Sequence, residues 1–128
     1  MPTVQPTYYP SLSPHSISVI STIAGTGTAS YSGDGSQATS ATMNGPHGVA
    51  IDSSGNVFIG DGANYRVRKI TALTGIITNY AGIGTSSYSG DNGAASSAAM
   101  TFPHQLSVDS SGIRINATIL WDMHSLTS

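Results

Sequence analysis

A repeat with an offset of 57 residues is the feature that most limits what this chain can fold into. The segment Ala24-Gly25-Thr26-Gly27-Thr28 returns as Ala81-Gly82-Ile83-Gly84-Thr85, and Tyr31-Ser32-Gly33-Asp34 returns as Tyr88-Ser89-Gly90-Asp91. The further pairs at this offset are Met43 with Met100, Pro46-His47 with Pro103-His104, and Asp52-Ser53-Ser54-Gly55 with Asp109-Ser110-Ser111-Gly112. No gap is needed between positions 24 and 55. A repeat of this length indicates one supersecondary unit that is stacked on copies of itself.

Each unit has the pattern of short strands joined by turns. Around Val49 and Ile51 apolar residues alternate with less apolar ones, and we expect further strands at residues 56–59, 65–70 and 76–80. Residues 57–59 are apolar in both phases, which is typical of a sheet that is covered on both faces. The expected fold class is therefore all-β: blades of a β-propeller, each a four-stranded antiparallel meander. Because propellers usually have about four to eight blades, a chain of about two units predicts an incomplete one.

One stretch carries a family resemblance. Gly45-Pro46-His47-Gly48-Val49-Ala50-Ile51-Asp52-Ser53-Ser54-Gly55-Asn56-Val57-Phe58-Ile59, followed by Asp61, Asn64 and Arg66, resembles the NHL repeat. The Tyr-Ser-Gly-Asp-Gly segment with its Ala/Ser run is similar to the longer NHL blades of bacterial and teneurin-like proteins. The resemblance is close over residues 45–80 and extends to Gly112, and residues 17–24 resemble the last strand of a preceding blade. It implies a β-propeller but no single activity.

The two ends differ from the repeat. Residues 1–16 are rich in Pro, Ser and Thr, which predicts a disordered spacer and favours an extracellular or cell-surface protein. Residues 17–112 are the expected blades. Residues 113–128 diverge from the repeat. The offset aligns Arg114 with Val57 and Asn116 with Ile59, so the alternation of inward-facing and outward-facing residues slips by one position.

The composition excludes several classes of protein. The chain has only four Lys and Arg residues and a net charge of -2, which argues against a nucleic-acid partner. It contains no Cys, so disulfides and thiolate metal sites are excluded. No apolar run reaches the roughly 18 residues of a membrane span.

His47 and His104 occupy equivalent places in successive units and are the candidate metal ligands. They are expected at the mouth of the propeller channel, and NHL-like lyases use His in comparable regions. Two ligands do not complete a zinc site, so a loop residue that packs locally is the favoured interpretation. We therefore expect no cofactor, with a divalent metal as the alternative.

Asp34 and Asp91 are candidates for a loop site. A calcium loop needs several oxygen ligands, and each of these loops has one carboxylate, which favours an Asp that bonds to nearby backbone amides.

A second set of residues is expected to be structural. By the resemblance, Asp61, Asn64 and Arg66 form a lock, in which Arg66 reaches towards an Asp or a backbone carbonyl. Gly55 and Gly112 are the expected turn glycines. The charged run Arg66, Arg68 and Lys69 is typical of a solvated face.

The favoured function is a non-enzymatic scaffold that binds protein or glycan partners. Further blades or other chains would be needed to close its propeller. One alternative is part of a metal-dependent propeller lyase or hydrolase that uses the channel-mouth His residues. The other is a truncated gene product without independent function.

Overall fold

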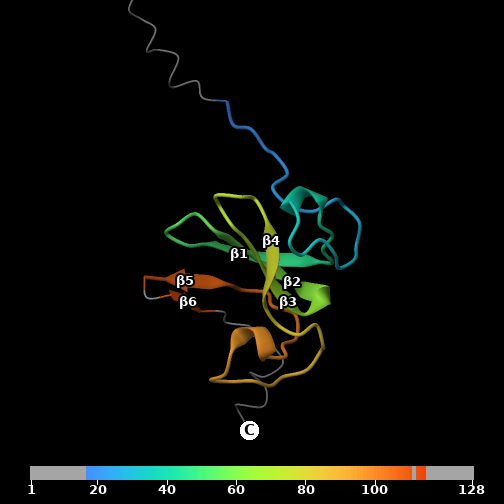
Figure 1. Ribbon diagram of the computed structural model, residues 1–128, viewed down its shortest axis with the longest axis vertical. Helices are drawn as coiled ribbons and strands as arrows, with labels where there is room; N and C mark the ends of the chain where they lie inside the picture. Colours follow the sequence, from blue (N-terminus) through green and yellow to red (C-terminus); the bar gives the residue numbers. More distant parts are fainter. Residues whose placement is uncertain (1–16, 111, 115–128) are drawn as a thin grey trace, which may run out of the picture.

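The computed structural model describes residues 17–110 and 112–114, so the expected spacer 1–16 and nearly all of the divergent segment 113–128 lie outside the described residues. The described part is all-β (Figure 1). Its strands are β1 (Pro46–Ile51), β2 (Val57–Asp61), β3 (Arg66–Ile70), β4 (Ile77–Ala81), β5 (Ser107–Asp109) and β6 (Gly112–Arg114). Its short 3-10 helices are η2 (Ala38–Ser40), η3 (Gly62–Asn64) and η4 (Ala95–Ser97).

Strands β1 to β4 form one antiparallel sheet in chain order, which confirms the predicted four-stranded meander. The turn between β1 and β2 shows why the chain reverses there. The Asp52 carboxylate accepts the backbone N–H groups of Ser54 and Asn56 and the Asn56 side-chain amide. Gly55 has a φ of 85°, a conformation that glycine adopts without steric cost. These contacts fix the register in which Ile51 pairs with Val57.

Both faces of the sheet are covered, one by the long loop of the same repeat unit and the other by the second unit. On one face Ile59, Ile70 and Ile77 pack with Ala38 and Ala41 from the loop that precedes β1. On the other face the buried cluster joins residues of β2, β3 and β4 to a residue of the second unit: Phe58, Val67, Ala81 and Met100. In Figure 1 the loop with η2 and the segment with η4 and β5 lie on different sides of the sheet. This arrangement explains why β2 is apolar in both phases.

In the described residues, the strands of the second unit are β5 and β6, which form a two-stranded sheet. Val108 pairs with Ile113, whereas the repeat offset would place Val108 opposite Arg114, so the pairing is one residue out of register with the first hairpin. Only two residues separate Asp109 from Gly112, and Gly112 is the first residue of β6. Unlike Gly55, which lies inside the turn before β2, Gly112 closes its turn and pairs with Asp109.

Residues 17–23 do not form the strand that the repeat predicts for them. They belong to no ladder, and Ile17, Val19 and Ile20 are 85%, 87% and 98% exposed. Their counterparts lead into β4, which β3 holds in the sheet by pairing with it, so that Ile77 is fully buried in the cluster with Ile59 and Ile70. Among the described residues, no strand lies beside residues 17–23 to do the same.

Candidate functional site

Where the two units meet, four rings form what we call the junction cluster: His47, Tyr65, Phe102 and His104. The ring centroids of His47 and His104 are 4.8 Å apart. Phe102 stacks on His104 with centroids 5.8 Å apart and an interplanar angle of 12°. Tyr65 meets the Phe102 ring edge-on at 5.4 Å. The structure thus brings the two predicted His residues together and adds two aromatic rings to them.

Glycines let the two units approach this closely. A Cβ atom on Gly48 would lie 2.3 Å from the carbonyl oxygen of His104, and one on Gly60 would lie 2.2 Å from that of Pro103. Real Cβ atoms essentially never come so close to a neighbouring heavy atom. The backbone of the second unit therefore rests directly on β1 and β2, and this contact sets the spacing of the two imidazoles.

Two members of the junction cluster have strained backbones. Tyr65 has a φ of 55° and Phe102 a φ of 35°, in the left-handed region that bulky residues rarely adopt. Such strain costs about 1–3 kcal/mol per residue and gathers at functional sites. His47 and His104 are exposed, and Phe102 is 41% exposed. The cluster is therefore a surface feature that the surrounding fold holds in place.

The described residues give the predicted metal site only two of its ligands. Within residues 17–110 and 112–114, no group of three or more His, Cys, Asp or Glu side chains could hold a metal ion. A tetrahedral zinc site takes three or four protein ligands. His47 and His104 therefore do not make such a site by themselves.

A second polar centre lies on the opposite face of the sheet, and we call it the Arg68 clasp. Arg68 on β3 is fully buried, although its sequence context favours a solvated face. All five of its N–H groups donate, to Asp34 Oδ1 (3.1 and 2.8 Å), Asp61 Oδ2 (3.2 Å), and the carbonyl oxygens of Ser32 (3.0 Å) and Thr42 (3.1 Å). These hydrogen bonds attach the long loop before β1 to the sheet. Asp34 of the loop and Arg68 of the sheet are 34 residues apart in the sequence.

The predicted lock residues have different partners from one another. Asp61 Oδ1 accepts the Asn64 side-chain amide and the Asn44 backbone N–H, each at 2.8 Å. Arg66 instead donates to two backbone carbonyls, those of Gly82 (3.1 Å) and Ile83 (2.8 Å). Asp61 and Asn64 are thus hydrogen-bonded to each other within the Arg68 clasp, whereas Arg66 connects β3 to the start of the second long loop by hydrogen bonds.

Asp34 has neither of the environments that its sequence suggests. Its carboxylate pairs with Arg68 and accepts the Tyr31 hydroxyl, so it is neither one of several calcium ligands nor an acceptor of backbone amides. Burial raises the pKa of Tyr31, and the hydrogen bond to Asp34 raises it further. The Arg66 and Arg68 guanidinium carbons lie 4.4 and 4.7 Å from the centre of the Tyr31 ring. Asp91, the counterpart of Asp34, accepts the Tyr88 hydroxyl at 2.7 Å.

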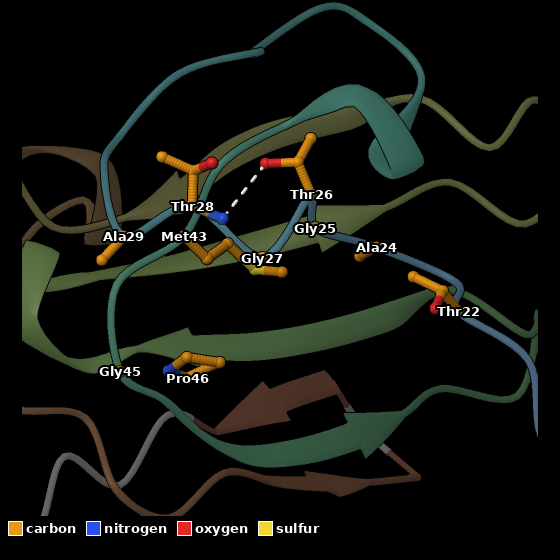
Figure 2. Close-up of a pocket in the computed structure, with 10 residues that line it drawn as sticks. All are labelled: Thr22, Ala24, Gly25, Thr26, Gly27, Thr28, Ala29, Met43, Gly45 and Pro46. Atoms are coloured by element: carbon orange, nitrogen blue, oxygen red, sulfur yellow. Dashed lines mark hydrogen bonds between the residues drawn. The ribbon is translucent and has the colours of Figure 1, made fainter.

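A pocket of about 500 Å³ lies between the first long loop and the start of β1 (Figure 2). Its described lining is small or apolar, apart from three threonines: Thr22, Ala24, Gly25, Thr26, Gly27, Thr28, Ala29, Met43, Gly45 and Pro46. Figure 2 shows the Thr28 N–H donating to the Thr26 hydroxyl. None of these residues is ionisable, so they offer no general acid or base.

A four-stranded antiparallel meander that recurs along the chain and packs one face on the next unit is a β-propeller blade, and this defines the class of protein. The sequence profile of the teneurin NHL domain matches residues 18–87, more than half of the chain. The chain therefore belongs to the teneurin NHL domain family.

Among solved structures, the chain is similar to a structural-genomics protein of unknown function from Bacteroides thetaiotaomicron VPI-5482. The identity is 28%, the TM-score is 0.53, and the match covers 57% of this chain and 18% of the other. The chain thus spans less than a fifth of that protein's length. No curated protein matches significantly. In the described residues, no helix has the length and apolar character needed to cross a membrane.

Proposed function

We propose that this chain is part of a non-enzymatic propeller scaffold that binds a protein or glycan partner through the junction cluster. The observation that carries the proposal is the set of exposed rings His47, Phe102 and His104, whose positions are fixed where the two units meet. Aromatic faces supply a large contact area, and their edges and polar atoms add directional contacts.

Preorganisation favours binding by such a cluster. Association loses free energy whenever flexible side chains must become ordered. Here Phe102 is held by Tyr65 on one side and His104 on the other, and the backbone beneath them contacts Gly48 and Gly60 directly. The rings therefore have little rotamer freedom left to lose when a partner binds.

The test is a screen of the chain against glycan and peptide arrays, followed by calorimetry on each ligand that binds. The variant Phe102→Ala removes the central ring of the cluster. Leu73→Ala is the matched control, because Leu73 is an apolar residue that is 97% exposed in the turn between β3 and β4. We expect Phe102→Ala to lose affinity and Leu73→Ala to keep it. Equal affinity in both variants, or chemical conversion of a bound ligand, would contradict the proposal.

The close pair of imidazoles also favours a second candidate, part of a metal-dependent lyase or hydrolase. This candidate requires further ligands from outside the described residues, since His47 and His104 supply only two. Metal analysis of the purified chain, repeated on a His47→Ala, His104→Ala double variant, separates the two candidates. Metal that the wild type holds and the double variant loses would favour the enzyme, and a wild type without metal would exclude it.

A further inference from the structure

The surface with which the second unit packs on the first has an exposed counterpart in the first unit. Leu106 and Val108 of the second unit pack on the buried cluster around Phe58. At the repeat offset their counterparts are Val49 and Ile51 on β1, which are 60% and 61% exposed. We call the side of β1 that carries these two residues the open face. It has the apolar side chains of a surface that packs on a sheet.

Residues 19–24 have the sequence of a strand but do not lie in a sheet. At the repeat offset they align with residues 76–81, which include β4. β4 pairs with β3, and Ile77 is fully buried there. Its counterpart Ile20 is 98% exposed, and within the described part of the chain no ladder includes residues 19–24. This segment can therefore pair with the edge strand of another sheet.

The turn that follows β4 receives an arginine side chain. Arg66, the first residue of β3, donates to the carbonyl oxygens of Gly82 (3.1 Å) and Ile83 (2.8 Å). The next glycine makes room for the guanidinium group, since a Cβ atom on Gly84 would lie 2.4 Å from Arg66 Nη2. Two carbonyl oxygens and a glycine thus form the seat of this arginine.

The long loop before β1 begins with a turn of the same backbone conformation. Gly25 and Gly27 have φ angles of 93° and 91°, and their counterparts Gly82 and Gly84 have 92° and 85°. In this turn, however, a Cβ atom on Gly27 would meet nothing within 4 Å. The carbonyl oxygens of Gly25 and Thr26 accept no hydrogen bond from any residue in the described ranges. The turn lines the pocket of about 500 Å³ that Figure 2 shows, so the space for a guanidinium group is open here.

We infer that residues 19–27, together with the open face, bind a protein partner that presents a β-sheet whose edge strand begins with an arginine. In the complex, residues 19–24 join that edge strand as β4 joins β3. The partner's arginine donates to the carbonyl oxygens of Gly25 and Thr26, and the apolar face of its sheet covers the open face. A guanidinium group suits this turn because it presents several N–H donors in one fixed fork, which an ammonium group does not.

The partner is a different protein and not a second copy of this chain. Arg66 already donates to Gly82 and Ile83 of its own chain, so it does not reach another molecule. In the second unit, the repeat offset places Met123 at the position of Arg66, and a methionine side chain has no N–H group. The inference is independent of the proposed function, because the junction cluster shares no residue with the open face or with residues 19–27.

The probe is a fluorescein-labelled peptide with the sequence of residues 57–71, which spans β2 and β3. Its binding to the full chain is followed by fluorescence anisotropy, and the site is located by NMR shifts of the backbone amides. We expect the shifts to include residues 19–27. Arg66→Gln in the peptide should lower the affinity about tenfold. Arg68→Gln in the peptide is the matched control and should leave the affinity unchanged, because Arg68 donates to groups of its own unit.

The protein variant is Gly27→Ala, whose methyl group occupies the space for the guanidinium group. Gly35→Ala is the matched control, because Gly35 is also exposed, has a φ of 84°, and would meet nothing within 4 Å if it carried a Cβ atom. The two substitutions thus strain the backbone alike, and only the first one blocks the turn. We expect Gly27→Ala to lower the affinity for the peptide about tenfold and Gly35→Ala to leave it unchanged.

Four results would each overturn the inference. They are equal binding by the two glycine variants, equal binding of the wild-type and Arg66→Gln peptides, NMR shifts that exclude residues 19–27, and no binding at millimolar peptide.

Discussion

Replacing Arg68 by Met should strongly lower the free energy of unfolding of this domain. Arg68 and Asp61 are both fully inaccessible to solvent, with Nη1 and Oδ2 3.2 Å apart. Removing one partner of a buried ion pair leaves the other charge uncompensated and costs about 3–5 kcal/mol. The ion pair with Asp34 adds little to this figure, because that side chain is 36% exposed and exposed pairs contribute at most about 1 kcal/mol.

The assay is urea unfolding followed by circular dichroism. With a slope of about 1–3 kcal/mol per molar urea, a loss of about 4 kcal/mol shifts the midpoint by more than about 1 M. A loss of about 4 kcal/mol is a large part of the free energy of unfolding, which is about 5–15 kcal/mol for most domains.

Arg66→Met is the matched control, two residues along the same strand. It should cost about 1–2 kcal/mol, because Arg66 is half-buried and donates to two carbonyls without facing a buried charge. Adding Asp61→Asn to Arg68→Met should recover part of the loss, since it removes the unpaired carboxylate. The reasoning is refuted if Arg66→Met is as costly as Arg68→Met, or if the second substitution makes the first one worse.

Three further predictions concern backbone contact and pH. Gly60→Ala places a Cβ atom 2.2 Å from the Pro103 carbonyl oxygen and should lower the unfolding free energy by about 3 kcal/mol, measured in the same urea assay. The hydrogen bond from the Asn56 side chain lowers the pKa of Asp52 below its usual 3.8. The ionised Asp52 therefore stabilises the fold above pH 3.8, and this stabilisation is lost as the pH falls through the lower pKa of the folded state. In Asp52→Asn, the free energy of unfolding should depend less on pH in this acidic range. Burial raises the pKa of Tyr31 above 10.0, so ultraviolet titration should show one tyrosine that ionises late, and stability should fall as the pH rises above 10.0; a normal titration that is unchanged in Tyr31→Phe would contradict this.

The four-stranded meander was predictable because its signals are local. Alternation around Val49, the turn at residues 53–55 and the glycine at position 75 each act within a few residues, and each precedes or forms a strand boundary in the structure. The apolar run of β2 also predicted correctly that both faces are covered. These features depend on neighbouring residues and do not require knowledge of the tertiary fold.

The Arg68 clasp was missed because its partners are distant in sequence. A run of three charges is usually solvated, and Arg68 is buried only because the loop that contains Asp34 folds over it. One signal was present: Arg68 shares its strand phase with Ile70, so it points to the face that the long loop before β1 covers. Combined with the repeated Tyr-Ser-Gly-Asp loop, that phase predicts a buried pair.

The junction cluster was predictable only in part. The repeat indicates that His47 and His104 are equivalent, but the closeness of their rings depends on the packing of one unit on the next. That packing requires glycine at positions 48 and 60, as well as the left-handed backbones of Tyr65 and Phe102. Sequence spacing alone does not predict any of these contacts.

The central claim is that both faces of one four-stranded sheet are covered, one by the long loop before β1 and the other by the second unit. Nuclear Overhauser contacts between methyl and aromatic protons test it most directly. The account predicts contacts from Ala41 to Ile77 on one face and from Met100 to Phe58 on the other, in a single folded species. Contacts on one face alone, or a helical pattern of sequential amide contacts through residues 46–81, would contradict it.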